Sequence, residues 1–148
     1  MTDLIAKVCR SIDAWNRGDF DACVDFAHPD VEWTSGVVEK LSGDAVYRGL
    51  DGVRRYWDEW HELWRVRLDV REIVQTGDTV VVVACTEARG DLSGVILRQR
   101  IGYTYEFEDR MARRVRSFID PDDAFEAVGI ERESASDPEL YSAASQGR

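Results

Sequence analysis

The chain has 148 residues, of which 44% are aliphatic or aromatic and 32% are charged. This length and composition are typical of one globular domain that buries a core without disulfide staples. Its 29 acidic and 19 basic groups give a net charge of −10 at pH 7, which disfavours nucleic acid and anionic membranes as partners.

Two helices are predicted at the start of the chain. In residues 3–17, apolar side chains recur at three- and four-residue steps: Ile5, Val8, Ile12 and Trp15. Gly18 is a natural stop, and Asp19 can cap a second, short helix. Pro29 excludes His28 from the helical region, so we expect the second helix to run to that point and to place His28 near the mouth of any pocket.

A short strand and a longer helix are expected next. The strand covers residues 31–33, and Val37 and Val38 fit either a strand fragment or a lid. The helical period returns from Gly49 to Trp64. Its apolar face carries Leu50, Val53, Trp57, Trp60 or His61, and Trp64.

After Trp64 the apolar period changes to two, which predicts strands. Alternation starts at Val66 and slips at residues 72–74, as at a β-bulge, before a tight turn at 76–78. The continuous run of valines at 80–83 indicates a strand that is covered on both faces. A long strand over 94–108 and another over 112–120 follow, joined by a turn at Asp109-Arg110.

The end of the chain divides into a closing helix and a tail. The helix starts at Asp120-Pro121 and ends at Gly129. Residues 131–148 are rich in Ser, Ala, Glu and Gln, so we expect a flexible or weakly docked tail after a domain that spans residues 1–130.

Four motifs resemble those of SnoaL-like domains in the NTF2-like superfamily, over about residues 3–130. They are Trp15-Asn16-Arg17-Gly18-Asp19-Phe20, His28-Pro29-Asp30-Val31-Glu32-Trp33, Tyr47-Arg48-Gly49 with Gly52-Val53-Arg54, and Gly77-Asp78 before the valine run. The resemblance implies an α+β cone, in which a curved mixed or antiparallel sheet wraps three helices around an internal pocket. This fold hosts isomerases, dehydratases, hydrolases, cyclases and non-catalytic binders, so it does not name a reaction. One departure is Arg110, where a glycine is common and a type I′ turn would demand positive φ.

The pocket is expected to bind a flat or cyclic ligand of apolar or aromatic character. Its expected lining is Trp15, Phe26, Trp33, Tyr47, Tyr56, Trp57 and Trp60, with Gln99, Tyr103 and Tyr105 from the long strand. Taken singly, Trp15 and Trp57 fit core packing better than ligand contact, but five tryptophans, all before residue 65, favour a pocket. We therefore expect Trp33 and Trp57 to face one shared cavity from opposite walls.

Candidates for acid–base catalysis are few: His28, Tyr103 and Tyr105. His28 also fits a capping role and His61 a core role, while Glu32 points away from the pocket if Trp33 points in. Alignment with ketosteroid isomerase, a worked case of this chemistry, puts Ser11, Trp33 and Tyr103 at the places of its catalytic Tyr and two Asp.

The isomerase carboxylates are therefore missing. An Asp–Arg–Asp set like that of epoxide hydrolases is not evident, and Tyr103 or Tyr105 occupies the region of the polyketide cyclase acid. A cofactor-free enzyme of cyclase, isomerase or dehydratase type and a non-catalytic binding or dimerisation module both remain open.

The spacing of the cysteines and the lack of long apolar runs indicate which cofactors and which cellular location to expect. Cys9, Cys23 and Cys85 have neither CxxC nor metal-ligand spacing, so we expect buried free thiols in a reducing compartment and neither a metal nor a cofactor. No window reaches the roughly 18 apolar residues of a membrane span, and a cytoplasmic protein is expected.

The outer face of the long strand is expected to be uncovered and to form a two-fold homodimer interface. It carries Ile96, Arg98, Arg100, Gly102, Thr104 and Glu106. Arg98 or Arg100 is expected to meet Glu106 across the interface, because an isologous contact requires a self-complementary patch.

Overall fold

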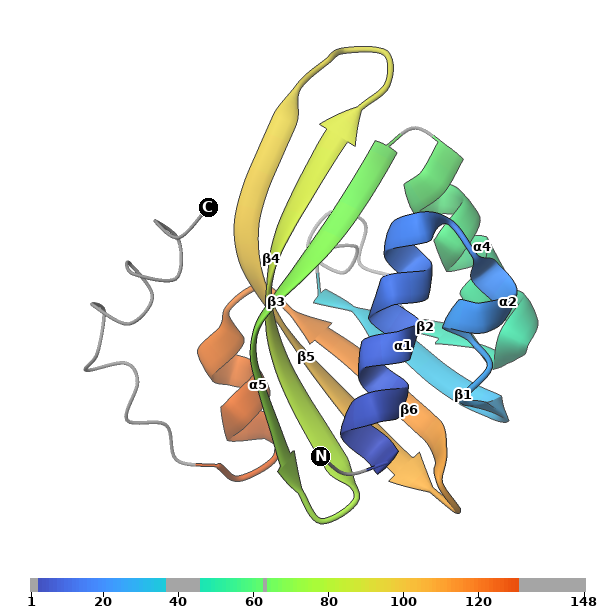
Figure 1. The fold of residues 1–148 in the computed structure, drawn as a ribbon, viewed down its shortest axis with the longest axis vertical. Coiled ribbons are helices and arrows are strands. Elements are labelled where there is room, and N and C mark those ends of the chain that lie inside the picture. Colours follow the sequence, from blue (N-terminus) through green and yellow to red (C-terminus); the bar gives the residue numbers. More distant parts are fainter. Residues whose placement is uncertain (1–2, 37–45, 63, 131–148) are drawn as a thin grey trace.

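The computed structural model describes residues 3–36, 46–62 and 64–130 (Figure 1). Its elements are α1 (Asp3–Arg17), α2 (Phe20–Cys23), β1 (Ala27–Ser35), β2 (Val46–Arg48), α4 (Gly49–Glu62), β3 (Trp64–Thr76), β4 (Thr79–Gly90), β5 (Ile96–Glu108), β6 (Met111–Phe118) and α5 (Pro121–Ala127). The predictions for Val37, Val38 and the tail at 131–148 lie outside the described residues. Within the described ranges, no helix combines the length and the apolar character needed to cross a membrane.

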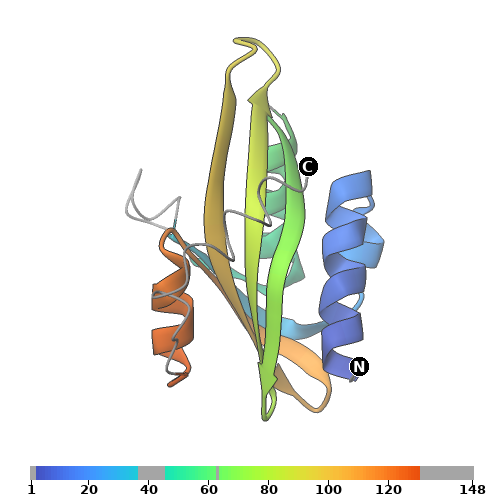
Figure 2. The same ribbon diagram turned by 60° about the vertical axis from the view of Figure 1, so that its left-hand side comes forward.

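The strands form one curved, mixed sheet with the order β2-β1-β6-β5-β4-β3. The β1–β6 pair is parallel and the other neighbours are antiparallel. Helices α1, α2 and α4 cover one face, and α5 lies on the other (Figure 2). The predicted α+β cone is confirmed, with α5 as an additional helix outside it.

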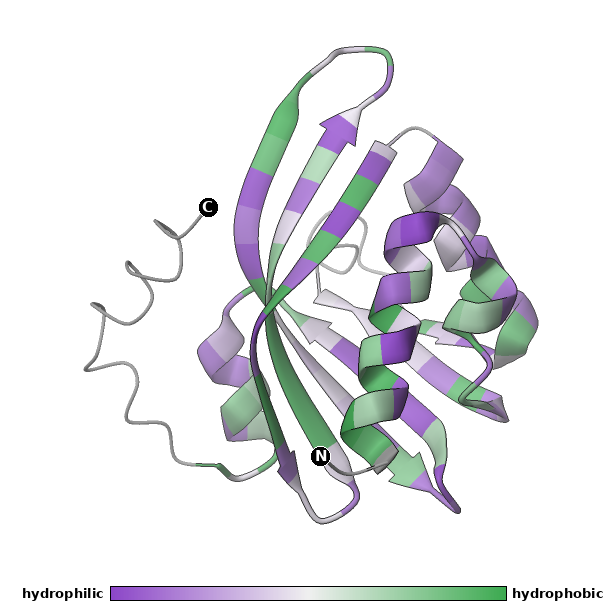
Figure 3. Cartoon of the chain, viewed as in Figure 1, coloured by the Kyte–Doolittle hydropathy of each residue, from purple (hydrophilic) through white to green (hydrophobic). Residues whose placement is uncertain are grey.

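The valine run forms the apolar half of β4 (Figure 3), and each of its two faces meets a different core. Val80 and Val82 belong to the main core under the concave face. Val81 and Val83 belong to a second core with Phe125 of α5. All four valines are fully buried, so the predicted two-sided burial of this strand is confirmed.

Helix α5 packs directly on β5 at Gly102. A Cβ atom at Gly102 would lie 2.8 Å from the Cβ of Ala124 and 2.9 Å from the Cα of Pro121. Thr104 on the same face is fully buried. The prediction that the outer face of this strand is uncovered is therefore wrong around Gly102, and only the part of the face that α5 does not reach is open.

The edge strand β3 is fastened to α1 through the Trp-Asn pair of the first motif. The Asn16 amide donates to the Leu68 carbonyl at 2.7 Å and accepts from the Leu68 N–H at 2.8 Å. The Trp15 indole N–H donates to the Val66 carbonyl at 3.0 Å. These bonds fix the spacing between helix and sheet, and they occupy backbone groups that an edge strand would otherwise leave open to pairing.

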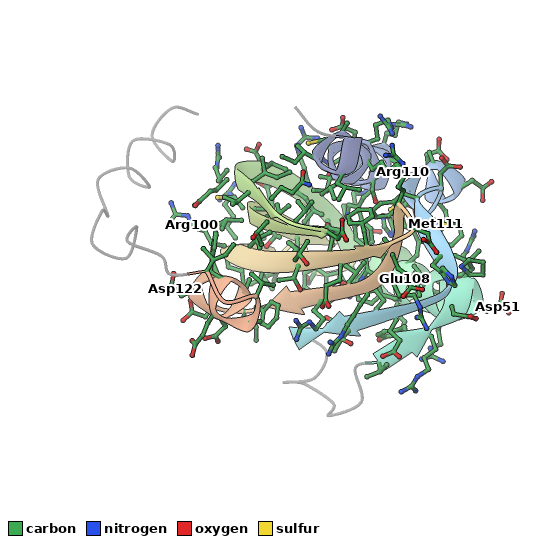
Figure 4. All side chains as sticks on the ribbon, turned by 90° about the horizontal axis from the view of Figure 1, so that it is seen from below. Asp51, Arg100, Glu108, Arg110, Met111 and Asp122 are labelled. Atoms are coloured by element: carbon green, nitrogen blue, oxygen red, sulfur yellow. The ribbon has the colours of Figure 1, made fainter. Side chains whose placement is uncertain are left out.

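Helix α1 is also fastened at its other end. The Lys7 ammonium donates to the Arg110 carbonyl at 2.6 Å. Figure 4 shows Arg110 and Met111 at the β5–β6 turn, on the opposite side of the view from Arg100 and from Asp122 of α5. Both turn residues have positive φ, 53° at Asp109 and 67° at Arg110, so the predicted backbone cost at this position is present.

Two predicted helix ends are wrong. The second helix ends at Cys23, and His28 and Pro29 lie in β1, where the pairing with β6 shifts between Ala27 and Glu32. Proline is tolerated in a strand at such an irregularity. The later helix ends at Glu62, so Trp64 opens β3 opposite Gly90.

Candidate functional site

An internal cavity of about 230 Å³ lies between the concave face of the sheet and the helices. Its lining comprises Ser11, Ile12, Trp15, Cys23, Trp33, Tyr56, Trp60, Trp64, Val66, Leu68, Thr86, Ala88, Leu97, Gln99, Ile101, Tyr103, Tyr105 and Ser117. None of these side chains carries a charge at neutral pH. Its volume is slightly below the roughly 300–1,000 Å³ typical of small-molecule sites.

Strand β5 supplies one wall of the cavity by simple alternation. Every second residue from Leu97 to Tyr105 lines it. The inward direction predicted for Gln99, Tyr103 and Tyr105 is therefore confirmed. Leu97 and Gln99 are exposed to solvent, so the cavity opens toward the start of β5.

Three tyrosines from two walls bring hydroxyl groups to the cavity. Burial raises the pKa of Tyr56 to about 12 and also raises the pKa values of Tyr103 and Tyr105 above the ordinary value. The Tyr56 hydroxyl hydrogen-bonds the side chains of Ser35 and Trp33. Within the described ranges, the Tyr103 and Tyr105 hydroxyls have no hydrogen-bond partner. All three stay protonated at pH 7, so they can donate hydrogen bonds but cannot act as bases.

The single thiol in the lining is equally unreactive. Burial raises the pKa of Cys23 to about 11, and the charge of Asp19 adds to this effect. The Ser11 hydroxyl donates to the Cys23 carbonyl at 2.7 Å. A protonated, buried thiol is a poor nucleophile at neutral pH.

Trp57 does not line the cavity, so the prediction that Trp33 and Trp57 share it is wrong. Its ring stacks on His61 at 3.9 Å and meets Trp15 and Phe20 edge-on, at 5.0 Å and 5.4 Å between centroids. Successive residues of a helix point about 100° apart, so Tyr56 and Trp60 face the cavity while Trp57 faces α1 and α2. Trp57 is therefore a core residue.

Phe26 and Tyr47 pack behind the lining instead of forming it. The Phe26 ring lies against those of Tyr105 and Phe107, at 6.1 Å and 5.9 Å between centroids. The Tyr47 hydroxyl donates to the Glu59 carboxylate at 2.7 Å. These two residues, which were predicted to contact a ligand, therefore do not line the cavity.

Neither histidine lines the cavity. His28 lies in β1, where its Nδ1 accepts the N–H of Asp30 at 2.9 Å. The prediction that His28 lies at a helix end, on which its expected catalytic role depended, is therefore wrong. His61 stacks on Trp57, and its Nδ1 lies 2.9 Å from the Trp57 carbonyl, which matches the core role considered for it.

Sequence reasoning missed the wall that β3 and β4 contribute. Val66, Leu68, Thr86 and Ala88 line the cavity together with Trp64. The alternation from Val66 to Val70 contained this signal, but Trp64 was assigned to the preceding helix, which concealed the inward register of β3. Ser117 of β6 gave no sequence signal beyond its place in a strand.

The positions aligned with the ketosteroid isomerase residues do meet in space. Ser11, Trp33 and Tyr103 all line the one cavity. At these positions the tyrosine is replaced by the hydroxyl of Ser11, and the two carboxylates are replaced by the indole of Trp33 and the phenol of Tyr103. Among the residues placed by the structure, no group of three or more His, Cys, Asp or Glu side chains could hold a metal ion.

Comparison with known proteins supplies the family. The model of the SnoaL-like domain matches residues 8–115. No curated protein matches the chain.

Solved structures share the fold at low identity. An NTF2-like protein of unknown function from Burkholderia pseudomallei K96243 is 20% identical, with a TM-score of 0.73 over 87% of this chain and 99% of its own. TerC, co-crystallised with polyporic acid, is 23% identical, with a TM-score of 0.72 over 84% of this chain and 97% of its own. A hypothetical protein with a ketosteroid isomerase-like fold from Catenulispora acidiphila DSM 44928, in complex with trimethylamine, is 9% identical, with a TM-score of 0.67 over 88% and 95%.

Proposed function

This chain belongs to the SnoaL-like domain family, and on that premise we propose that it binds a flat, apolar or aromatic small molecule in its internal cavity. The observation that carries the proposal is the uncharged, aromatic lining of that cavity. An ion would lose its hydration there without gaining a charged partner, whereas an apolar ring system gains by leaving water. The part of the ligand inside the cavity is therefore uncharged.

Hydrogen-bond donors define a second property of the ligand. Tyr103 and Tyr105 bring hydroxyls that have no partner among the described residues and whose raised pKa values keep them protonated. A carbonyl or hydroxyl oxygen on the ligand would satisfy them. TerC, a protein of the same fold, was co-crystallised with polyporic acid, which supports a small organic molecule as the ligand.

Binding without catalysis is the simpler reading of this lining, because no carboxylate or imidazole in the described lining could take a proton. A cofactor-free cyclase, isomerase or dehydratase is the second candidate. It rests on Tyr103, which could donate a hydrogen bond to an oxygen that gains negative charge in the transition state. Tyr105 could assist, and His28 has no part in either proposal.

Fluorescence titration with N-phenyl-1-naphthylamine tests the binding function, since this uncharged aromatic probe brightens in apolar sites. Ala88→Phe places a ring in the cavity and is expected to abolish saturable binding while the protein stays folded. Arg10→Phe, on the exposed side of α1, adds the same ring outside the cavity and should leave binding intact. Equal binding by both variants would show that the probe binds elsewhere.

A two-fold homodimer through the open part of the β5 outer face is also proposed. The side chains that were expected to pair across that interface form ion pairs within one chain. Arg98 pairs with Glu87 at 3.1 Å, and Glu106 pairs with Arg116 at 3.3 Å. The proposal therefore rests on the exposed face around Ile96, which is 39% exposed, and no longer on pairing between Arg98 and Glu106.

A further inference from the structure

An open groove of about 460 Å³ borders the cavity where the end of α1 meets the start of β3 and the end of β4. Trp15, Trp64 and Val66 line both hollows. Trp64 lies directly opposite Gly90 at this border, and a Cβ atom on Gly90 would be in ordinary van der Waals contact with the Trp64 ring, at 3.5 Å. The groove and the cavity therefore meet at these residues. Alternation directs Arg67 and Arg89 to the opposite face of the sheet from Val66 and Ala88, so one elongated ligand that occupied both would pass around the edge strand β3.

The two hollows differ sharply in charge. The described cavity lining carries none, whereas the groove is lined by four arginines and two carboxylates: Arg17, Arg65, Arg67, Arg89, Glu87 and Asp91. The whole chain has a net charge of −10. A cationic groove beside the cavity is thus a local feature that runs against the overall charge.

The carboxylates leave two of these arginines without a counter-charge. Asp91 pairs with Arg65 at 3.1 Å, and Asp19, outside the groove lining, pairs with Arg17 at 3.5 Å. Glu87 pairs with Arg98, which also lies outside the groove lining, at 3.1 Å. Within the described ranges, the side chains of Arg67 and Arg89 make neither an ion pair nor a hydrogen bond with another residue. Each guanidinium offers five N–H donors in a planar fork that suits carboxylate, sulfonate and phosphate oxygens.

The strand register adds a cost that an anion would relieve. Arg65 of β3 lies directly opposite Arg89 of β4. Like charges in directly opposed cross-strand positions destabilise a sheet. An anion bound to Arg89 would reduce this repulsion, and it could also accept hydrogen bonds from Arg67, which lies opposite Glu87 in the same register.

We propose that the ligand is amphiphilic, with an uncharged aromatic body in the cavity and an anionic group of the carboxylate, sulfonate or phosphate class in the groove. Arg67 and Arg89 hold the anion, and Trp64 stands at the border between the two parts. This inference rests on the proposed function, because it extends the binding site of the cavity to its neighbour.

Two probes with one aromatic skeleton test the inference. 1-Anilinonaphthalene-8-sulfonate carries the anion that N-phenyl-1-naphthylamine lacks. The wild type is expected to bind the sulfonate more tightly. Arg67→Gln plus Arg89→Gln should weaken sulfonate binding by roughly tenfold, the effect expected for loss of charge-assisted hydrogen bonds, and leave the uncharged probe unaffected. Added sodium chloride should weaken binding of the sulfonate alone.

The matched control is Arg10→Gln plus Arg48→Gln, which removes the same charge from exposed positions outside both hollows. It should leave both affinities unchanged. The anionic subsite is overturned if the wild type binds the two probes with equal affinity. It is also overturned if the two double variants lose sulfonate binding equally. In either case, binding of the uncharged probe still supports the proposed function. If neither probe binds, both proposals fail. Sodium sulfate that occupies the groove without competing with the sulfonate probe would also overturn the single-ligand arrangement.

Discussion

Tyr47 of β2 and Tyr103 of β5 differ in their hydrogen bonding. Tyr47→Phe removes the 2.7 Å hydrogen bond to Glu59 and is expected to lower the free energy of unfolding by about 1–2 kcal/mol. Tyr103→Phe removes a hydroxyl without a partner among the described residues. It should leave that free energy unchanged or raise it by up to about 1 kcal/mol.

Urea unfolding of the two variants measures this contrast. Because each variant loses one phenolic oxygen, the comparison isolates the effect of the partner. A loss of stability in Tyr103→Phe as large as that in Tyr47→Phe would mean that the Tyr103 hydroxyl is hydrogen-bonded within the protein. It would then not be free to bind a ligand, which would contradict that part of the proposed function.

Cys23 should make the protein sensitive to alkaline pH. Its pKa of about 11 in the folded state exceeds the ordinary value of 9.0, so the native state holds this proton more tightly than the unfolded chain. The resulting stabilisation is fully present below about pH 9 and is lost as the pH rises toward about 11. Tyr56, raised from 10.0 to about 12, adds a second loss above about pH 10.

Urea midpoints between pH 8 and pH 10.5 test the Cys23 contribution against Cys23→Ser, which cannot ionise in this range. The wild type should lose more stability than the variant over this range, because it holds one more thiol with a raised pKa. Parallel curves for the two proteins would assign the alkaline loss to the tyrosines and to Cys9, whose pKa is also raised by burial.

At the level of elements, Asn16 supplies two of the hydrogen bonds that hold α1 to the edge strand β3, beside the one from Trp15. Asn16→Ala removes both hydrogen bonds to the Leu68 backbone and is expected to destabilise the fold by about 2–3 kcal/mol. Exchange of the Leu68 amide proton should accelerate, since it loses its acceptor. Arg17→Ala, at the exposed neighbouring position, serves as the control and should change the stability by less than about 0.5 kcal/mol.

The packing of α5 on β5 gives a second prediction at this scale. Gly102→Ala places a methyl group 2.8 Å from the Cβ of Ala124, and overpacking of this kind should cost about 1–3 kcal/mol. Adding Ala124→Gly removes that contact but leaves the one with Pro121, so it should restore only part of the loss. Thermal melts compare the three proteins, and a Gly102→Ala variant with wild-type stability would show that α5 is not seated on this glycine.

For the whole molecule, the proposed homodimer predicts a mass in light scattering of about twice the 16.9 kDa chain. Ile96→Glu places a charge on the open part of the outer β5 face and should shift the mass to that of a monomer. Leu50→Glu, at another exposed apolar position, is the control and should remain dimeric. A monomer mass for the wild type at high concentration contradicts the proposal.

Features that depend on neighbours along the chain could be predicted from the sequence. The stripe of α1, the valine run of β4 and the alternation of β5 each follow from the period at which side chains return to one face. The positive φ angles at Asp109 and Arg110 follow from the geometry of a two-residue hairpin turn. These local rules were sufficient to place Tyr103 and Tyr105 on the cavity wall.

The tertiary structure decided which partner covers each face. Trp57 and Trp60 both belong to the apolar side of α4, yet Trp57 packs on α1 and α2 and only Trp60 lines the cavity. The cover of Gly102 by α5 and the meeting of Arg67 with Arg89 in one groove likewise join segments that are distant in the chain. Periodicity fixes the direction of a side chain relative to its own element, whereas the group that it meets depends on how the elements pack.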